Sequence, residues 1–330
     1  MEFSTRVELH EQKPPSISLV SLWPQFHNKL KLQGKSENTL KNYKTDMDCF
    51  SLYLIDQQGN DTLDKMDLPS ILLYGKFLEK KYSSNNSRRR RVQTLRIFFD
   101  FLVETKVMES NPVRKIPTSP KFVDIPRPTK FVDVKTLWLS MIKQNKSDSE
   151  LGNLIRERNQ AIFLLIYYTG LKVSDLSKLQ KDQVHLSHNP RVLVNPKNRD
   201  PYTIPLSAFA AKLIKRYLET LEGQKIKSQI SFSEILFNAN PHKILSGGLS
   251  SRGIEILMED YRRKLGIEVT PKSLRQAAIL NWINLGHNDS TVKDWMGVAP
   301  SYSLKSYKEV RNEYFYNNQA IEELYEHGRF

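Results

Sequence analysis

Two stretches of the sequence carry arginines at positions that suit phosphate chemistry. Arg88–Arg91 form a run of four arginines directly after the polar segment SSNNS. The segment TPKSLRQAAILNWINLGH at 270–287 reads as the start of a helix that carries Arg275, and APSYSLKSYKEV follows it. A guanidinium group offers a planar, permanently charged fork to two phosphate oxygens. The second stretch therefore raises the question whether the chain holds a working active site or a site that only binds phosphate.

The charge balance predicts the kind of partner. Fifty lysines and arginines against 36 acidic residues give a net charge of +14. Such an excess favours a polyanion, because each neutralised phosphate releases bound counterions. Double-stranded DNA and a membrane surface are both polyanions. We expect no membrane partner, since the longest apolar run, Ala161–Gly170, is about half of the roughly 18 residues that span a bilayer.

Two further features predict the compartment. Cys49 is the only cysteine and cannot form an internal disulfide, which is typical of proteins in a reducing cytoplasm. The N-terminal segment MEFSTRVELHEQKPP lacks the basic and apolar regions of a secretion signal. With DNA as the partner, we expect a cytoplasmic protein associated with the nucleoid.

Length and pattern predict two mainly helical domains. A chain of 330 residues is long for a single core. Apolar residues at spacings of three and four indicate four helices within residues 17–112, after a flexible lead-in at 1–16. Five prolines fall between 112 and 128, and proline does not fit inside a helix. Residues 113–132 are therefore predicted to be an extended linker.

The second domain, 133–330, is predicted to be helical with one β interruption. Two β-rich runs, Val192–Asn195 and Tyr202–Leu206, flank the polar turn PKNRDP. The predicted fold class is mainly α, with a four-helix N-terminal domain and a mostly helical C-terminal domain that contains a small β-sheet. The other helices expected in this domain are Ala208–Gly223, Ser250–Leu265, Leu274–Leu285 and one near Asn317–Glu326.

The run Arg88–Arg91 is predicted to open a helix and to contact DNA phosphates. Cations at a helix N-terminus oppose the macrodipole at a cost of roughly a few tenths of a kcal/mol, and phosphate binding would offset that cost. Lys41 and Lys44, on an earlier predicted helix, are expected to join the same DNA-binding face. A solvated charge run, or a cluster like a nuclear-localisation signal, is the alternative.

This order of elements resembles that of the tyrosine recombinases, the family of phage integrases and Xer-type chromosome recombinases. In the first domain, SENTLKNYKTDMDCFSLYL and SRRRRVQTLRIFFDFLVETKVMESNPV are similar to the family's core-binding domain. Asn111-Pro112 stands where that domain closes. The resemblance covers about residues 17–310. It implies a SAM-like fold for the first domain and a catalytic tyrosine-recombinase fold for the second.

Two segments early in the second domain resemble catalytic segments of the family. LLIYYTGLKVSDLSKLQKDQV is similar to the segment in which the first catalytic arginine follows T-G-L and an acid stands three residues later. In this chain Lys172 occupies the arginine position, and Asp175 is the acid. The hairpin VLVNPKNRDPYTIPLS resembles the family's β turn with its catalytic lysine, which is Lys197 here.

Two later segments complete the resemblance. TPKSLRQAAI is similar to the segment in which a histidine stands three residues before the second catalytic arginine; here the histidine position is Lys272 and the arginine is Arg275. WMGVAPSYSLKSY resembles the segment L-G-H followed nine residues later by the nucleophilic tyrosine. The histidine position is Val298, and the tyrosine is Tyr307.

The resemblance implies a reaction that needs no metal ion or other cofactor. In the family, a tyrosine hydroxyl attacks a DNA phosphodiester to give a 3′-phosphotyrosyl link and a free 5′ hydroxyl, and a second exchange reverses this step. The protein itself must then neutralise the phosphorane. Two arginine forks suit that task, a lysine protonates the leaving oxygen, and the histidine positions supply acid–base help.

Three of the six catalytic positions depart from the family pattern. Val298 removes a hydrogen bond, and Lys272 is a poor base at neutral pH, with an ordinary pKa of about 10.4. Lys172 keeps the charge but loses the bidentate fork. Since loss of one preorganised donor costs roughly 3–4 kcal/mol, or about 10²–10³ in rate, strand exchange is predicted to be weak or lost.

Three functions stay open at this point. The favoured hypothesis is a protein of the tyrosine-recombinase fold that clamps duplex DNA between its two domains. The second is an active but divergent site-specific recombinase or integrase that uses Tyr307, with help from a second recombinase as one variant. The third is a scaffold that binds RNA or an acidic protein.

The C-terminal segment NNQAIEELYEHGRF is predicted to mediate self-association on DNA. It places Ile321, Leu324 and Tyr325 on one face of a helix. In relatives such a helix docks on a neighbouring protomer, so the resemblance implies the same contact here. Packing against its own chain is the alternative.

Overall fold

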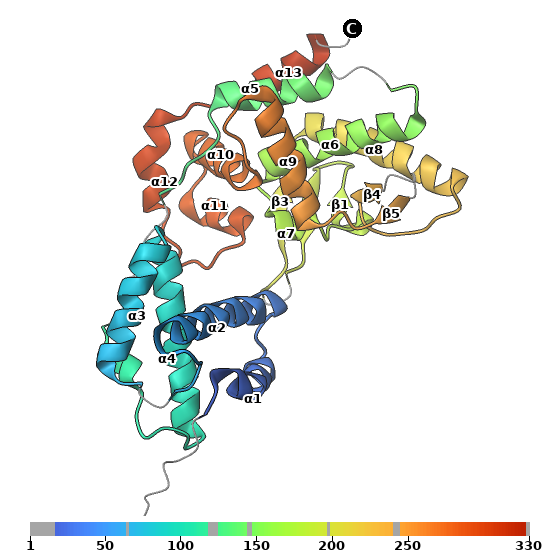
Figure 1. Ribbon diagram of the computed structural model, residues 1–330. Helices are drawn as coiled ribbons and strands as arrows, with labels where there is room; N and C mark the ends of the chain where they lie inside the picture. Colours follow the sequence, from blue (N-terminus) through green and yellow to red (C-terminus); the bar gives the residue numbers. More distant parts are fainter. Residues whose placement is uncertain are drawn as a thin grey trace, which may run out of the picture. The chain divides into compact units, whose positions relative to one another are not determined.

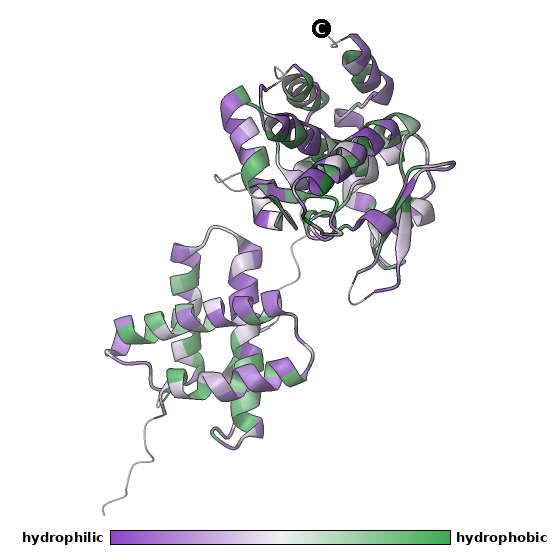
Figure 2. Ribbon diagram, turned by 90° about the vertical axis from the view of Figure 1, so that its right-hand side faces the viewer, coloured by the Kyte–Doolittle hydropathy of each residue, from purple (hydrophilic) through white to green (hydrophobic). Residues whose placement is uncertain are grey.

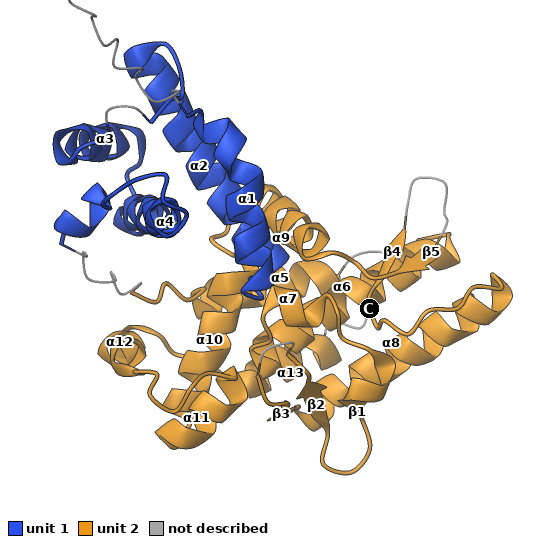
Figure 3. Ribbon diagram, turned by 90° about the horizontal axis from the view of Figure 1, so that it is seen from below, with its two compact units in different colours: residues 1–123 blue, residues 124–330 orange. Residues whose placement is uncertain are grey.

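The computed structural model describes residues 17–63, 66–117, 125–143, 147–196, 199–239 and 245–327. It is dominated by helices (Figure 1) and separates into two units, residues 1–123 and 124–330 (Figure 3). Each unit has a hydrophobic core of its own. Apolar and polar residues alternate along the helices of both units, as expected for helices that cover a core (Figure 2).

Unit 1 contains the four helices that the sequence predicts. Helix α2 begins after Ser36, whose side chain accepts a hydrogen bond from the Thr39 N–H, and ends at Gly59, which has φ of +79°. Both are common helix-end signals. The core is aromatic, with Phe26 and Phe98 fully buried and their ring centroids 5.2 Å apart. The elements of unit 1 are α1 (Leu19–Leu32), α2 (Glu37–Gln58), α3 (Leu68–Lys81), α4 (Asn85–Glu104) and the 3-10 turn η1 (Pro112–Lys115).

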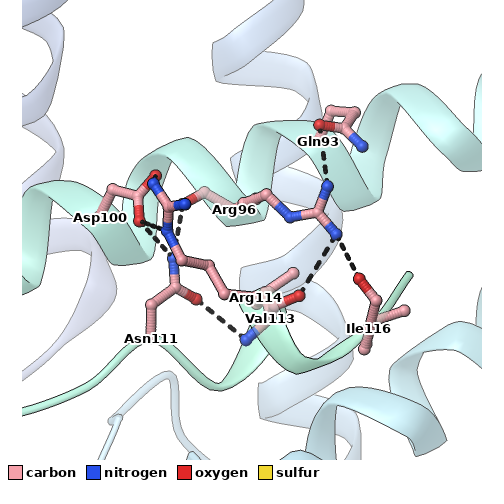
Figure 4. Close-up of polar contacts among 7 residues, drawn as sticks. All are labelled: Gln93, Arg96, Asp100, Asn111, Val113, Arg114 and Ile116. Atoms are coloured by element: carbon pink, nitrogen blue, oxygen red, sulfur yellow. Dashed lines mark hydrogen bonds and ion pairs between the residues drawn. The ribbon is translucent and has the colours of Figure 1, made fainter. Parts of the chain in front are cut away.

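The turn η1 is fastened to helix α4 by a polar network (Figure 4). Asp100 accepts hydrogen bonds from Asn111 Nδ2 at 2.8 Å and from Arg114 Nε at 2.7 Å. Arg96 Nη2 donates to the carbonyl oxygen of Ile116 at 2.6 Å. Charge-assisted bonds of this kind are stronger than neutral ones. The first residues of the predicted linker therefore form a compact turn rather than an extended chain.

The arginine run lies inside helix α4 and not at its beginning. Ser84 caps the helix by accepting from the Ser87 N–H at 3.3 Å, so α4 begins at Asn85. The prediction that the run opens the helix is wrong because polar residues that precede the run form the first turn. Arg91 is only 6% exposed, and its guanidinium lies 3.6 Å from the centroid of the Tyr82 ring. Arg91 is therefore not available to DNA in this structure, contrary to the expectation from sequence.

Asp46 of α2 is the buried counter-charge of the arginine run. Its Oδ1 lies 2.8 Å from Arg90 Nη2 and 3.8 Å from Arg91 Nε, and its Oδ2 accepts from Thr94 Oγ1 at 2.8 Å. Burial raises the pKa of this carboxyl, while Thr94 and the two arginines act to lower it. The group thus bears a desolvation cost that its partners offset only in part.

Replacing Asp46 by alanine should destabilise unit 1 by about 3 kcal/mol, because the change leaves the buried Arg91 without a counter-charge. Thermal unfolding of the full chain, followed by circular dichroism, measures the destabilisation. Asp48→Ala is the matched control on the same helix: its carboxylate is 57% exposed and pairs with Lys44, so the expected cost is below about 0.5 kcal/mol. Equal costs for the two variants would contradict this role for Asp46.

Helix α6 (Glu150–Thr169) lies at the centre of unit 2, where it packs against α5, α8 and α10. Its second half is the apolar run at Ala161–Gly170, which is buried as a helix within the core, as predicted. Gly170, with φ of +55°, ends the helix, and a Cβ there would lie 2.9 Å from the Trp282 ring. None of the helices that the structure describes is long and apolar enough to cross a bilayer.

Helices of different lengths make up most of the rest of unit 2. The remaining helical elements are α5 (Phe131–Ile142), α7 (Val173–Leu176), η2 (Lys181–Gln183), α8 (Ala208–Lys227), α9 (Ser251–Leu265), α10 (Pro271–Asn284), α11 (Asp289–Met296), α12 (Lys305–Val310), η3 (Arg311–Glu313) and α13 (Asn318–His327). The bounds predicted from the sequence for α8, α9, α10 and α13 lie within four residues of these.

Unit 2 contains two small antiparallel sheets rather than the single β interruption expected. The predicted hairpin is present as β2 (Arg191–Val194) and β3 (Tyr202–Pro205), with Val192 opposite Ile204, and β1 (Val184–His185) adds a third strand. A second sheet pairs β4 (Phe237–Ala239) with β5 (Leu245–Gly247). The sequence does not predict this second sheet, because strands of three residues are too short to show the alternation of a half-buried strand.

Helix α13 packs on its own unit. Ile321 is fully buried, Tyr325 is 7% exposed, and the Tyr325 ring lies 6.0 Å from that of Trp138 on α5. Trp138 Nε1 also donates to the carbonyl oxygen of Ile321 at 3.0 Å. The apolar face of the C-terminal segment is thus covered within the same chain, as in the alternative that the sequence left open.

Candidate phosphate-binding site

Helix α10 fixes the position of Arg275. Thr270 and Ser273 cap its N-terminus reciprocally, and Pro271 occupies the first turn. Two guanidinium N–H groups of Arg275 donate to backbone carbonyls, one to Gly170 and one to Met296, the latter at 3.0 Å. These carbonyls lie at the ends of α6 and α11. A guanidinium has five N–H donors, so up to three are left for a ligand.

Arg275 lines a cavity of about 690 Å³ together with Lys172 and Lys272. Lys172 immediately precedes the short helix α7, and Lys272 lies on the first turn of α10. The structure therefore brings together three of the site residues predicted from sequence. Helix α9 contributes further charged side chains to the lining, namely Arg252, Glu255, Glu259 and Arg262. The excess of cations over carboxylates suits an anionic ligand.

The electrostatics of Lys172 reflect this convergence of cations. Partial burial lowers the pKa of its ammonium group, and the charges of Arg275 and Arg199 lower it further, while Asp175 acts in the opposite direction. Lys172 therefore loses its proton at a lower pH than an exposed lysine does. A bound phosphate would stabilise the charged form and raise the pKa again.

The affinity for duplex DNA should fall as the pH rises from 7 toward 10. The reason is that Lys172 loses its proton at a lower pH than an ordinary lysine, and a neutral Lys172 attracts phosphate less well. Lys172→Arg should weaken this dependence, since a guanidinium stays charged throughout. Fluorescence anisotropy with labelled duplex DNA at constant ionic strength measures both proteins. A parallel decline of the two affinities would show that Lys172 is not the titrating group.

The β2–β3 hairpin meets the end of α11 through Tyr202. Gly297 has φ of +58°, and a Cβ at this position would lie 2.3 Å from Tyr202 Cζ, so only glycine leaves room for the ring. The Tyr202 hydroxyl and Asp175 Oδ2 are both buried without a hydrogen-bond partner among the described residues. Burial raises the pKa of Tyr202, and the charge of Asp175 adds to that effect. Tyr202 is not among the site residues predicted from the sequence; an aromatic residue next to the polar turn is the one signal available for it.

Gly297→Ala should destabilise the fold by about 2–4 kcal/mol, from the left-handed backbone and from the clash with Tyr202. Gly266→Ala is a matched control, because Gly266 has φ of +65° but nothing within 4 Å of an added Cβ. Its expected cost is about 1–2 kcal/mol, from the backbone alone. Chemical denaturation of the full chain gives both values. If the two costs were the same, the contact with Tyr202 would be unimportant.

Tyr307, the predicted nucleophile, lies on α12 and is only 6% exposed. Burial, together with the nearby Tyr302, raises the pKa of its hydroxyl to about 12, although the charge of Arg275 and a hydrogen bond from the Gln276 side chain lower it. The hydroxyl is therefore neutral at physiological pH and needs a base to become a nucleophile. Tyr307 is not among the residues that line the cavity, whereas Arg275 is. The charge of Arg275 nevertheless acts on the Tyr307 hydroxyl, whose pKa it lowers.

The other site residues predicted from the sequence differ in their positions and in their burial. Lys197 lies outside the described residues. Val298 is partly buried and packs against the core of unit 2. In unit 1, Lys41 and Lys44 are exposed on α2, and Lys44 pairs with Asp48 at 2.9 Å. The remaining arginines of the run, Arg88, Arg89 and Arg90, are partly exposed.

Comparison with protein families identifies matches in both units. Residues 138–313 match the phage integrase family, and residues 24–106 match the N-terminal SAM-like domain of phage integrases. Together with the helical architecture and small antiparallel sheets, these matches confirm the predicted fold class.

Individual relatives cover most of the chain. The chain is 26% identical over 280 residues to the tyrosine recombinase XerD of Listeria innocua, which covers 84% of this chain and 90% of the relative. It is 28% identical over 302 residues to the tyrosine recombinase XerA of Thermococcus kodakarensis, covering 92% of this chain and 95% of the relative.

Two solved structures share the fold. One is a lambda integrase dimer bound to a COC′ core site, with a TM-score of 0.65, 16% identity, and coverage of 93% of this chain and 84% of the other. The other is the XerH site-specific recombinase bound to a palindromic difH substrate, with a TM-score of 0.65, 14% identity, and coverage of 91% and 83%.

Proposed function

Because the chain belongs to the phage integrase family of tyrosine recombinases, we propose that it binds duplex DNA and holds one backbone phosphate in the cavity of Lys172, Lys272 and Arg275. The convergence of these three cations on one cavity of about 690 Å³ is the observation that supports this most directly. Arg275 would bind the phosphate through its fork, and the two lysines would act as point charges.

Strand exchange by this site is proposed to be weak or lost. Lys172 cannot reproduce the bidentate contact of an arginine, and its lowered pKa further reduces the charge that it offers at alkaline pH. Val298 provides no donor or base. The raised pKa of Tyr307 adds to the barrier, because no histidine stands at either of the two positions where the family pattern has one.

Unit 1 is proposed to supply contacts to the DNA backbone, so that the two units together clamp the duplex. The side chains proposed for this role are Arg88, Arg89, Arg90, Lys41 and Lys44, whereas Arg91 is excluded by its burial. Removing one cation that binds a phosphate should reduce the slope of log affinity against log salt by about 0.9. A protein that acts in this way would be found with the nucleoid.

The test begins with selection of binding sites from a random pool of duplexes, followed by affinity measurements at several salt concentrations. The proposal predicts salt-dependent binding of duplex DNA that weakens in Lys172→Ala and in Arg89→Ala. The exposed Lys178→Ala serves as control. Tighter binding of RNA than of any duplex, or binding that is indifferent to Lys172, would refute it and favour an RNA-binding or protein-binding scaffold.

An active recombinase is the second candidate, because Tyr307 is retained next to Arg275 at the spacing of the family nucleophile. This candidate predicts a covalent protein–DNA adduct that survives denaturing electrophoresis and disappears in Tyr307→Phe. A second recombinase acting on the same site is part of this hypothesis. Adding a related recombinase that lacks its own tyrosine would then raise the yield of adduct.

Copies of the chain are proposed to associate on DNA through α13; a solved lambda integrase structure of the same fold is a dimer bound to a core site. In the single chain the apolar face of α13 is covered by its own α5, so association would require α13 to leave that site. Truncation after Asn317 should then leave one protein per DNA site, as measured by native mass spectrometry. Unchanged stoichiometry would rule out this role for α13.

A further inference from the structure

Two glycine turns hold the guanidinium of Arg275, and both have the same backbone form. The carbonyl oxygen of Gly170 accepts one hydrogen bond from Arg275, and that of Met296, the residue before Gly297, accepts the other. Gly170 has φ of +55° and Gly297 has φ of +58°, and the N–H of each donates to a carbonyl in the last turn of its helix. The direction of the Arg275 side chain therefore depends on how firmly these two turns keep their shape.

An aromatic ring lies against each of these glycines. The Trp282 ring contacts Gly170, where an added Cβ would lie 2.9 Å from Cη2. The Tyr202 ring contacts Gly297, where an added Cβ would lie 2.3 Å from Cζ. Glycine has the most backbone freedom of all residues. The two rings restrict that freedom, because a large change of φ and ψ at either glycine would move the chain into space that a ring already fills.

The other glycines of the same conformation provide a comparison. The described residues contain seven glycines with positive φ. Within this set, four have no described atom within 4 Å of an added Cβ, and a fifth has only a carboxylate oxygen of Glu234, at 3.7 Å. Among the described turns, rings therefore cover only the two glycines whose turns hold Arg275. Gly59 and Gly266 end their helices without a ring, so helix termination does not account for the rings.

We propose that Tyr202 and Trp282 are positioning residues, which fix Arg275 for a DNA phosphate by packing on the two turns that hold it. The proposal rests on the role of Arg275 given above. A donor that is held in place before its ligand arrives costs no reorganisation when the ligand binds. Tyr202 lies on β3 and Trp282 on α10, so the hairpin and the helix that carries Arg275 both contribute to its direction.

The ring of Tyr202, rather than its hydroxyl, is the part that acts. The hydroxyl is buried without a hydrogen-bond partner among the described residues. Tyr202→Phe removes only this group and should leave Arg275 fixed, whereas Tyr202→Ala removes the ring and should loosen the turn at Met296. Tyr314→Ala is the matched control. Tyr314 is also a partly buried tyrosine packed on the core of unit 2, but it is not among the atoms nearest to either glycine.

The guanidinium of Arg275 reports the result directly, in the full chain without DNA. In protein with ¹⁵N-labelled arginine, its two Nη groups give separate resonances as long as the guanidinium does not rotate rapidly about the Nε–Cζ bond. The resonances are assigned by their absence in Arg275→Lys. Loss of one hydrogen bond of a charged group should speed this rotation by about tenfold to a hundredfold in Tyr202→Ala. The rotation rate should be unchanged in Tyr202→Phe and in Tyr314→Ala.

Trp282→Phe tests the other turn. Phenylalanine keeps an aromatic ring in the core but is too short to reach Gly170, because Cη2 lies at the far end of the indole. Rotation of the guanidinium should again become faster. Trp138→Phe is the same substitution at another buried tryptophan of this core, and it should leave the rotation rate unchanged.

Three results would overturn the proposal. They are a guanidinium that rotates as slowly in Tyr202→Ala as in Tyr314→Ala, one that rotates as fast in Tyr202→Phe as in Tyr202→Ala, and equal rates in Trp282→Phe and Trp138→Phe. Should Tyr202→Ala fail to fold, the comparison of the two tryptophan variants decides alone. Because DNA is absent from these measurements, they can fail while the phosphate site itself is upheld by the affinity measurements above.

Discussion

Replacing Arg275 by alanine should lower the affinity for duplex DNA by about tenfold to a hundredfold, because a charged hydrogen bond to phosphate contributes roughly 1.5–3 kcal/mol. Any residual formation of a covalent adduct should fall by a further factor of about 10²–10³, the usual effect of removing one preorganised transition-state donor. The reason lies in the geometry of the guanidinium, whose direction is fixed by the carbonyls of Gly170 and Met296. Fluorescence anisotropy and denaturing electrophoresis measure the two effects.

The controls for this prediction separate charge from geometry. Arg263→Ala removes a cation from α9 that is 66% exposed, pairs with Asp260, and does not line the cavity, so it should leave both readouts within about twofold. Arg275→Lys keeps the charge but cannot hold two carbonyls and a phosphate together, and it should resemble alanine in cleavage more than in binding. If Arg263→Ala and Arg275→Ala weakened binding equally, only net charge would matter.

Lys172→Arg should increase the yield of covalent protein–DNA adduct by about 10²-fold or more, the largest gain expected from any single change. An arginine at this position restores the bidentate contact whose absence is proposed to limit the chemistry. Arginine also removes the effect of the lowered lysine pKa, because it is charged throughout the pH range. The adduct is quantified on a selected duplex site after a fixed time at pH 8.

Two comparisons make the gain interpretable. The adduct formed by Lys172→Arg must vanish when Tyr307→Phe is added, since a different nucleophile would otherwise be responsible. Lys178→Arg, at an exposed position six residues further along, should leave the yield unchanged. A Lys172→Arg variant that binds DNA normally but forms no adduct would place the block elsewhere, with Lys272 and Val298 as the next positions to restore.

Local signals in the sequence are sufficient to predict where most of the helices lie. Ser36 and Gly59 act as the ends of α2, as their residue types indicate, and the apolar run at 161–170 is the buried part of α6. The three cations of the cavity were predicted from spacing relative to a family pattern. These cations come from segments about a hundred residues apart. Local patterns therefore do not predict that they meet in one cavity, whereas the fold shared with the family does.

Other features depend on tertiary contacts and left no trace in the sequence. Arg91 is indistinguishable from its three neighbours until Asp46 and Tyr82 surround it. Gln276 reads as one more polar residue on a helix, and only the structure shows that its side-chain oxygen accepts a hydrogen bond from the Arg127 N–H of the segment that enters unit 2. The second sheet was not predicted because its strands are too short to show a periodic pattern. Its pairing depends on the contacts between the two strands.

The two carbonyls that hold Arg275 have a consequence for the protein without DNA. Gly170 follows the last residue of α6 and Met296 is the last residue of α11, so both belong to helix C-termini, which carry partial negative charge. In the chain without DNA, the partial negative charges of these two helix ends partly neutralise the guanidinium of Arg275. The cation-rich cavity can therefore form without a bound phosphate, and a DNA phosphate adds to a neutralisation that the fold already provides.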